Sequence, residues 1–211
     1  PKKNLENLWK LGEKEYVIFQ HELSNCTLGA YRNEGDVIYP VPRISLEQKG
    51  NGSFAPLNYE QQCYFHLLSD PGTPIKICAG IAGAGKTKAA LEFGFSAVAD
   101  QHNPIERMLL VREPVGMGKD LGYLTGNKNS KTGEWNNHVK DNIKYDKQLT
   151  FSEMLERGLI EIDVPHYMQG RSIENTWVII DEAQNLTREQ FIMLGTRVAK
   201  NHLTIFCNSC T

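Results

Sequence analysis

The stretch Ala79–Thr87, which reads AGIAGAGKT, decides what kind of fold this chain adopts. It satisfies the pattern G-x-x-x-x-G-K-[ST] at Gly80, Gly85, Lys86 and Thr87. In such a loop the glycines allow a tight turn and a close approach of the backbone to phosphate groups. The backbone amides and the start of the following helix attract the anion. We therefore expect a phosphate-binding loop, in which Lys86 reaches the β- and γ-phosphates of a nucleotide and Thr87 holds Mg²⁺.

The segments on either side of this loop support that interpretation. The apolar run IKICA (75–79) is typical of a buried strand, and residues 86–100 have apolar side chains at helical spacing. From residue 57 onward, helices and strands alternate. Helices are expected at 57–70, 86–100, 150–158 and 187–200, and strands at 75–79, 107–111, 159–164, 177–180 and 203–206. This alternation predicts an α/β fold with a mostly parallel sheet that helices cover on both faces.

Local signals mark where these helices begin. Asn58 is a suitable N-cap for the first helix, and the pairs Thr150 with Glu153 and Thr187 with Gln190 read as capping boxes. The N-terminal 55 residues instead alternate short apolar runs with Gly, Asn and Asp turn signals, and KGNGS (49–53) reads as a linker. Strands are expected there at 15–20, 26–31 and 36–39. The chain is therefore divided into a small β-rich module at 1–55 and a P-loop domain at 56–211.

A second chemical element is the stretch WVIIDEAQNLT (177–187), where four apolar residues lead into two carboxylates. Asp181, at the end of a buried strand, can hold the Mg²⁺ shell, and Glu182 can polarise the attacking water. Two adjacent carboxylates resist joint ionisation unless a cation offsets them. Mg²⁺ and Lys86 would supply that charge, so the expected cofactors are ATP and Mg²⁺.

Several segments together resemble one known family. LNYEQ (57–61) is similar to the adenine-reading segment of superfamily-one helicases. VREPVGMGKDLGYLTG (111–126) and the stretch 167–198 resemble two conserved blocks of PhoH-type ATPases. Because four blocks occur in the right order, the chain is identified as a member of the PhoH-like ATPases. Residues 1–55 resemble, more loosely, the segment that joins the two halves of the PIN–PhoH fusion type, which pairs a PIN-domain ribonuclease with a PhoH ATPase.

This resemblance implies a RecA-like P-loop NTPase fold and ATP hydrolysis coupled to RNA unwinding or translocation, often in a ring of subunits. By position it implies that Gln61 reads the adenine and that Gln184 senses the γ-phosphate. Arg112 and Arg171 would lie near phosphate or RNA, although each is equally compatible with a solvated surface charge. The catalytic residues implied are Lys86, Glu182 and Gln184. The nucleotide-binding residues of the loop are then Gly80, Ala82, Gly83, Ala84, Gly85, Lys86 and Thr87, with Thr87 and Asp181 as metal ligands.

The chain departs from the family pattern after its last apolar run. CNSCT (207–211) carries Asn208 and Ser209 where the family has Gly and Asp, so nucleotide sensing by this segment is in question. The family's C-terminal segment, with a basic motif that reaches phosphate, and the PIN domain do not occur in the chain. The chain also begins without Met. We therefore expect a fragment of a longer protein, or an engineered piece of one, with reduced activity and without nuclease activity.

RNA binding must depend on a local patch, because the net charge of −2 provides no overall basic field. Residues 112–147 interleave lysines with aromatic side chains, which suit phosphates and unpaired bases respectively. The expected RNA contacts are Lys119, Lys128, Lys131 and Trp135. An alternative interpretation is an amphipathic surface helix at 134–145 that packs Trp135 inward.

Other features narrow the class of protein. No apolar run approaches the length of a membrane span, no signal peptide is visible, and the five cysteines are scattered and odd in number. We expect reduced thiols and a cytoplasmic location. Cys207 and Cys210 form a C-x-x-C without a second ligand pair at suitable spacing, which disfavours a zinc site. Two rival functions remain open: a P-loop kinase for a small molecule, and a nucleotide-binding assembly subunit that does not hydrolyse ATP alone.

Overall fold

The computed structural model describes residues 3–21, 27–48, 52–113, 151–168, 170, 173–197 and 203–210. The chain divides into two compact units. The first contains Pro1–Glu47 and Ser53–Asp70, and the second contains Gln48–Gly52 and Pro71–Thr211. The expected domain boundary lies between residues 55 and 56. The helix that follows this boundary belongs to the first compact unit. The division into a module at 1–55 and a domain at 56–211 stays a prediction.

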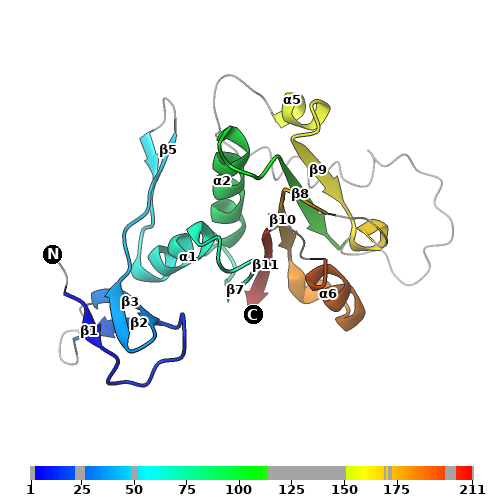
Figure 1. Cartoon of the computed structure of the whole chain (residues 1–211). Coiled ribbons are helices and arrows are strands. Elements are labelled where there is room, and N and C mark those ends of the chain that lie inside the picture. Colours follow the sequence, from blue (N-terminus) through cyan, green and yellow to red (C-terminus); the bar gives the residue numbers. More distant parts are fainter. Residues whose placement is uncertain are drawn as a thin grey trace. The chain divides into compact units, whose positions relative to one another are not determined.

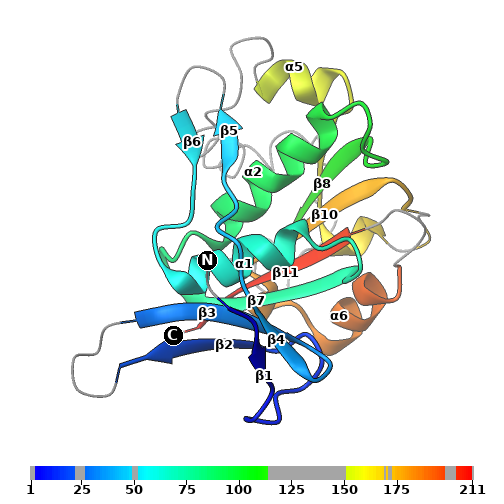
Figure 2. The same ribbon diagram turned by 60° about the vertical axis from the view of Figure 1, so that its left-hand side comes forward.

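The first unit is built on a four-stranded antiparallel sheet (Figure 2). Its spatial order is β1-β4-β3-β2, and the bounds are Leu5–Glu6 for β1, Tyr16–Gln20 for β2, Thr27–Glu34 for β3 and Val37–Pro40 for β4. The three strands expected from the sequence are therefore confirmed. The turn between β3 and β4 contains Gly35 with φ of 74°, a left-handed conformation that glycine adopts without steric cost.

The segment expected as a linker at 49–53 is partly strand. A two-stranded sheet joins β5 (Leu46–Gln48) and β6 (Gly52–Phe54), so residues 52 and 53 belong to β6. The reason lies just beyond the expected linker: the Phe54 ring stacks on Phe65 with centroids 5.1 Å apart. This apolar contact anchors β6 and favours an extended chain where composition alone suggested a loop.

Helix α1 (Tyr59–Ser69) completes the first unit and confirms the expected helix at 57–70. Asn58 caps it, because its side-chain oxygen accepts a hydrogen bond from the backbone N–H of Gln61 at 2.8 Å. Phe65 and Leu68 are buried. The side-chain amide of Gln62 donates to the carbonyl of Val41 at 2.6 Å. Apolar burial and a buried hydrogen bond thus hold α1 within this unit.

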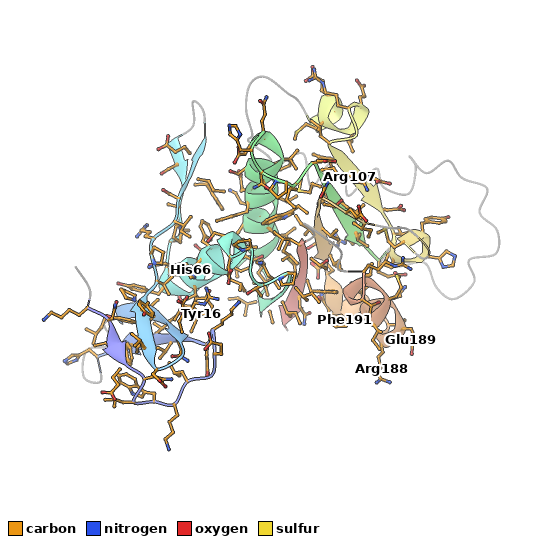
Figure 3. All side chains as sticks on the ribbon, in the orientation of Figure 1. Tyr16, His66, Arg107, Arg188, Glu189 and Phe191 are labelled. Carbon is orange, nitrogen blue, oxygen red and sulfur yellow. The ribbon has the colours of Figure 1, made fainter. Side chains whose placement is uncertain are left out.

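A polar cluster also links α1 to the antiparallel sheet (Figure 3). The Tyr16 hydroxyl lies 2.9 Å from Nδ1 of His66, and Arg32 forms an ion pair with Asp70 at 2.7 Å. Burial raises the pKa of Tyr16 to about 12. Burial, followed by the positive charge of Arg32, lowers the pKa of His66. Both rings of the Tyr16–His66 pair therefore favour their neutral forms.

The second unit is an α/β domain with a five-stranded parallel sheet, which confirms the expected fold class (Figure 1). The spatial order is β7-β11-β10-β8-β9. The bounds are Ile75–Ile81 for β7, Arg107–Arg112 for β8, Ile160–Asp163 for β9, Thr176–Asp181 for β10 and Leu203–Cys210 for β11. All six residues of β10 are buried, as expected for a strand covered on both faces.

Helix α2 (Lys86–Ala99) covers one face of this sheet. The indole N–H of Trp177 in β10 donates to the carbonyl of Ala90 at 3.0 Å. At Gly94 the helix approaches so closely that an added Cβ would lie 2.6 Å from the Met108 sulfur and 2.7 Å from the Trp177 ring. Glycine at this position therefore sets the close distance between α2 and the sheet.

Helix α6 (Arg188–Gly195) lies on the other face. Leu194 joins the core cluster with strand residues that include Val178, Ile180 and Phe206, and Phe191 packs against Phe206 with ring centroids 4.4 Å apart. The capping box of Thr187 and Gln190 is present as expected. The described helix ends at Gly195, earlier than the expected residue 200, and Thr196 is its C-cap residue.

Three short helices are also found among the described residues of the second unit. They are α5 (Phe151–Glu156), η1 (Pro165–Met168) and η2 (Ala183–Asn185). Gly158, the expected stop of the helix at 150–158, has φ of 69°, whereas Thr150 lies outside the described residues. Among the helices that the structure describes, none has the length and apolar character to cross a membrane.

Candidate functional site

The loop between β7 and α2 forms the centre of the candidate site. β7 ends at Ile81 and α2 begins at Lys86. The turn between them contains Gly83 with φ of 76° and Gly85 with φ of 84°. A side chain would strain the backbone at both positions, which explains why glycine stands at these places. The strand–loop–helix context expected for a phosphate-binding loop is therefore present.

Lys86 turns back onto this loop. Its ammonium group donates hydrogen bonds to the carbonyls of Gly80 at 2.9 Å and Ile81 at 2.8 Å, and the residue is only 8% exposed. Burying a cation is costly unless hydrogen bonds compensate. The loop carbonyls provide such compensation, and they keep the charge at the place where phosphate oxygens would lie in a phosphate-binding loop.

Thr87 and Asp181 meet although 94 residues separate them. The Thr87 hydroxyl donates to Oδ1 of Asp181 at 2.7 Å, and Asp181 is buried. Arg112, at the end of β8, brings Nη1 to 3.7 Å from Oδ2 of the same carboxylate. A hydroxyl and a carboxylate are the oxygen ligands that Mg²⁺ prefers. This donor set fits the metal that the sequence predicts.

The fold explains why these residues converge. In a parallel sheet all carboxyl ends of the strands lie at one edge, so the loop after β7 and the end of β10 share that edge. β11 separates these two strands in the sheet. α2 bridges the separation by packing across the sheet face beneath Trp177. The first turn of α2 is thereby brought to Asp181.

Glu182 and Gln184 form the next part of the site. Glu182 has φ of 50° and ψ of 45°, a left-handed conformation that is uncommon for a residue with a side chain. The side-chain amide of Gln184 donates to Oε2 of Glu182. Its Oε1 accepts a hydrogen bond from the backbone N–H of Ser209 at 3.0 Å. The two residues expected to orient water and to sense phosphate therefore contact each other.

Sequence reasoning missed two contacts at this edge. Ser209 contributes only its backbone N–H to the contact with Gln184, and a side-chain motif cannot predict such a contact. Gln190, expected only as half of a capping box, also donates from Nε2 to Oε2 of Glu113 at 3.0 Å. Glu113 follows Arg112 directly, so this bond joins the start of α6 to the end of β8. A polar residue immediately after a buried strand was the only sequence signal for it.

The remaining expected residues are distributed as follows. Gln61 lies in the first turn of α1, in the first unit, and its Oε1 accepts a hydrogen bond from the backbone N–H of Leu57 at 2.8 Å. Adenine reading by Gln61 stays a prediction. Ala82 and Ala84 lie in the turn of the loop. Arg171 and the four expected RNA contacts lie outside the described residues: Lys119, Lys128, Lys131 and Trp135.

Known proteins resemble this chain over most of its length. Residues 53–211 match the family described as PhoH-like protein. Protein PhoH2 of Bacillus subtilis (strain 168) is 31% identical over 193 residues, which cover 88% of this chain and 43% of that protein. Protein PhoH2 of Thermobispora bispora is 36% identical over 146 residues, covering 67% and 33%. A PhoH-like protein of Synechocystis sp. is 34% identical over 125 residues, covering 59% and 38%.

The chain spans less than half the length of each of these relatives. The family match nevertheless includes the loop at 80–87, the carboxylates at 181 and 182 and all five strands of the parallel sheet. The match covers residues 53–211, which is more than half of the chain. The chain belongs to the PhoH-like protein family, a family of ATP-binding P-loop proteins.

Proposed function

We propose that this protein hydrolyses ATP at the loop 80–87 and couples hydrolysis to RNA binding or unwinding. The observation that carries the proposal is the 2.7 Å hydrogen bond between Thr87 and Asp181 beside the buried Lys86. It joins the phosphate loop to the carboxylate edge of the sheet, which are the two parts that a P-loop hydrolase must bring together.

The residues of the chain suit distinct tasks in this reaction. The loop amides would hold the phosphates, and Lys86 would exchange the carbonyls of Gly80 and Ile81 for γ-phosphate oxygens. Thr87 and Asp181 would hold Mg²⁺, which when bound offsets the charge of the β- and γ-phosphates. Arg112 would keep Asp181 oriented through their ion pair.

Glu182 is the residue that we assign to the water. Its carboxylate would accept a hydrogen bond from the attacking water and align it with the γ-phosphorus. A bond then forms between the water oxygen and the phosphorus while the bond to the β–γ bridging oxygen breaks, which yields ADP and inorganic phosphate. Asp181 already contacts Thr87 and Arg112, so Glu182 is the better placed of the two carboxylates for this task.

The proposal has three further parts: an RNA partner, a ring of subunits and the PIN–PhoH fusion type. RNA is supported by the lysines and aromatic residues of the stretch 112–147 and by the family resemblance. The PIN–PhoH type is supported by the resemblance of residues 1–55 to the segment that joins the two halves of such fusions. The match to PhoH2 of Bacillus subtilis covers 88% of this chain and so extends before residue 53 into this segment. A ring would appear as an increase in molecular size when ATP and Mg²⁺ are added.

The deciding experiment is ATP turnover with and without single-stranded RNA, for the wild type and Lys86→Ala. We expect RNA to stimulate turnover, and we expect Lys86→Ala to lose nucleotide binding because the ammonium that faces the phosphates is removed. Lys88→Ala, an exposed lysine two residues further along α2, is the matched control. Phosphate transfer to a small molecule would favour the kinase alternative. Tight ATP binding with ATP-dependent assembly but no turnover would favour the assembly subunit.

A further inference from the structure

Gln184 occupies a position between two parts of the candidate site. One end of its side-chain amide donates to the carboxylate of Glu182, and the other end accepts from the backbone N–H of Ser209 at 3.0 Å. A primary amide can serve both partners at once because it carries a donor and an acceptor. The side chain of Gln184 therefore connects η2 to β11.

The sheet register explains why a side chain fills this place. β10 pairs with β11 only as far as Ile180 and Phe206, and β10 ends at Asp181. β11 continues to Cys210 and stays paired with β7 over that length. On the side where β10 has ended, Gln184 accepts the hydrogen bond of Ser209. The amide thus replaces a neighbouring strand at this point.

The same residue of β11 also pairs with the phosphate loop. Ser209 is in register with Gly80, the first glycine of the loop motif. The carbonyl of Gly80 accepts a hydrogen bond from the ammonium of Lys86 at 2.9 Å. A continuous set of contacts therefore runs from Lys86 through the β7–β11 pairing to Gln184 and Glu182.

The backbone of Glu182 indicates that this arrangement is imposed by its surroundings. The residue adopts φ of 50° and ψ of 45°, which is unfavourable for a side-chain-bearing residue and persists only where contacts over-determine it. The turn that begins there places Gln184 two residues further along, within reach of both partners. The left-handed conformation and the amide bridge are parts of one local structure.

We propose that Gln184 is a positioning residue that couples the orientation of Glu182 to the occupancy of the phosphate loop through the backbone of β11. The proposal rests on the ATP hydrolysis proposed above. When Lys86 leaves Gly80 for a phosphate, the β7–β11 pair adjusts and Gln184 transmits the change to Glu182. Because Ser209 contributes its N–H, this coupling does not need the Gly and Asp of the family pattern at 208 and 209.

Two substitutions of Gln184 each remove one of the two hydrogen bonds that its side-chain amide makes. Gln184→Glu retains an acceptor for Ser209 but removes the donor to Glu182. Gln184→Lys retains a donor for Glu182 but removes the acceptor. Asn185→Ala, a neighbouring exposed residue of η2, is the matched control. Gln184 is itself exposed, so none of these changes disturbs the core.

The measurements are kcat, KM for ATP and the hydrogen-exchange rate of the Ser209 amide by NMR. We expect both Gln184 variants to lower kcat about 10-fold or more with KM within about twofold, because the lost bonds orient a charged group used in turnover. Exchange at Ser209 should accelerate in Gln184→Lys and stay slow in Gln184→Glu. Wild-type kcat in Gln184→Glu, or equal exchange rates in the two variants, would overturn the proposal.

A third measurement does not depend on turnover. In the wild type, Mg²⁺ with a non-hydrolysable ATP analogue should shift the side-chain NH₂ resonance of Gln184, and Lys86→Ala should abolish the shift. An unshifted resonance in the analogue-bound wild type would contradict the coupling. If the wild type binds the analogue but hydrolyses no ATP, the proposed ATPase function fails, while the NMR results still decide whether Gln184 couples the two sites.

Discussion

Asp181 lies where three elements each contribute one residue to the site. It ends β10, Thr87 reaches it from the first turn of α2, and Arg112 reaches it from the end of β8. Its neighbour Glu182 instead contacts Gln184 and has a left-handed backbone. Although the two carboxylates are adjacent in the sequence, their partners differ, and this difference supports the separate tasks that we propose for them, namely holding the metal and orienting the water.

At the residue scale, we predict that Glu182→Gln leaves ATP binding intact but lowers turnover about 100-fold or more, because an amide lacks the negative charge with which the carboxylate would polarise and align the attacking water. Binding is measured by titration with a fluorescent ATP analogue, and turnover by phosphate release. Glu189→Gln, an exposed carboxylate on α6 (Figure 3), is the control and should keep both properties. Turnover at the wild-type rate in Glu182→Gln would remove Glu182 from its assigned role.

Helix α2 shows how packing at the element scale supports the site. It carries Thr87 at its first turn, and its distance from the sheet depends on Gly94, where Met108 and Trp177 leave no room for a Cβ. The Trp177 ring cannot move aside freely, because its indole N–H bonds to Ala90. Close packing in the middle of the helix therefore helps to hold its N-terminal end in place.

We predict that Gly94→Ala destabilises the second unit by roughly 1–3 kcal/mol from overpacking, reduced by about 1 kcal/mol from the better helix propensity of alanine. Gly195→Ala is the matched control, since a Cβ at Gly195 would meet no heavy atom within 4 Å. Chemical denaturation followed by circular dichroism measures both effects. Equal stability of the two variants would show that the contacts at Gly94 relax without cost.

The polar contacts between α1 and the antiparallel sheet lead to a prediction of how the stability of the first unit depends on pH. Burial and Arg32 lower the pKa of folded His66, while Asp70 and Glu34 act in the opposite direction. The unfolded chain takes up a proton near pH 6.5, whereas the folded chain resists it until a lower pH. The stability of the first unit should therefore fall as the pH drops below about 6.5.

His66→Gln removes this proton uptake and is the test of that prediction. Between about pH 7 and 5.5, the thermal unfolding midpoint of the variant should fall by less than that of the wild type. The comparison of slopes matters, because the variant also changes the contact with Tyr16 and so lowers stability at every pH. Parallel slopes in the two proteins would exclude His66 as the source.

The elements that the sequence predicted well are those set by local chemistry. Asn58, the capping box at Thr187 and the glycine-rich loop each act within a few residues, so their patterns are readable in the chain. The position of β11 between β7 and β10 depends on pairing between distant strands, which no local pattern encodes. The Gln184–Ser209 contact was missed for the same reason, because it forms only after β11 extends beyond β10.

At the scale of the whole molecule, the charge of −2 limits how RNA can be attracted. Without a general basic field, the RNA binding that we propose must depend on a small number of local cations. The candidate stretch 112–147 is where lysines and aromatic residues occur together. The RNA affinity that we propose for this stretch would therefore be sensitive to a few substitutions rather than to the overall charge.

We predict that Lys128→Glu combined with Lys131→Glu weakens single-stranded RNA binding at low salt about 10-fold or more, because it replaces two phosphate-neutralising charges by repulsive ones. Fluorescence anisotropy with a labelled oligonucleotide measures the affinity. Lys3→Glu combined with Lys10→Glu changes the net charge equally at exposed positions of the first unit and is the control. Unchanged affinity in the first variant would rule out this stretch as the RNA contact.

The environment of Trp177 has a practical consequence for optical work on this protein. Trp177 is 3% exposed in the second unit, whereas Trp9 is 51% exposed in the first. A sheltered indole emits at shorter wavelength than a hydrated one, so the two residues report on different units in a single emission spectrum. With Trp135 replaced by phenylalanine, the emission of Trp177 would report the loosening of α2 from its sheet, and the emission of Trp9 would report unfolding of the first unit.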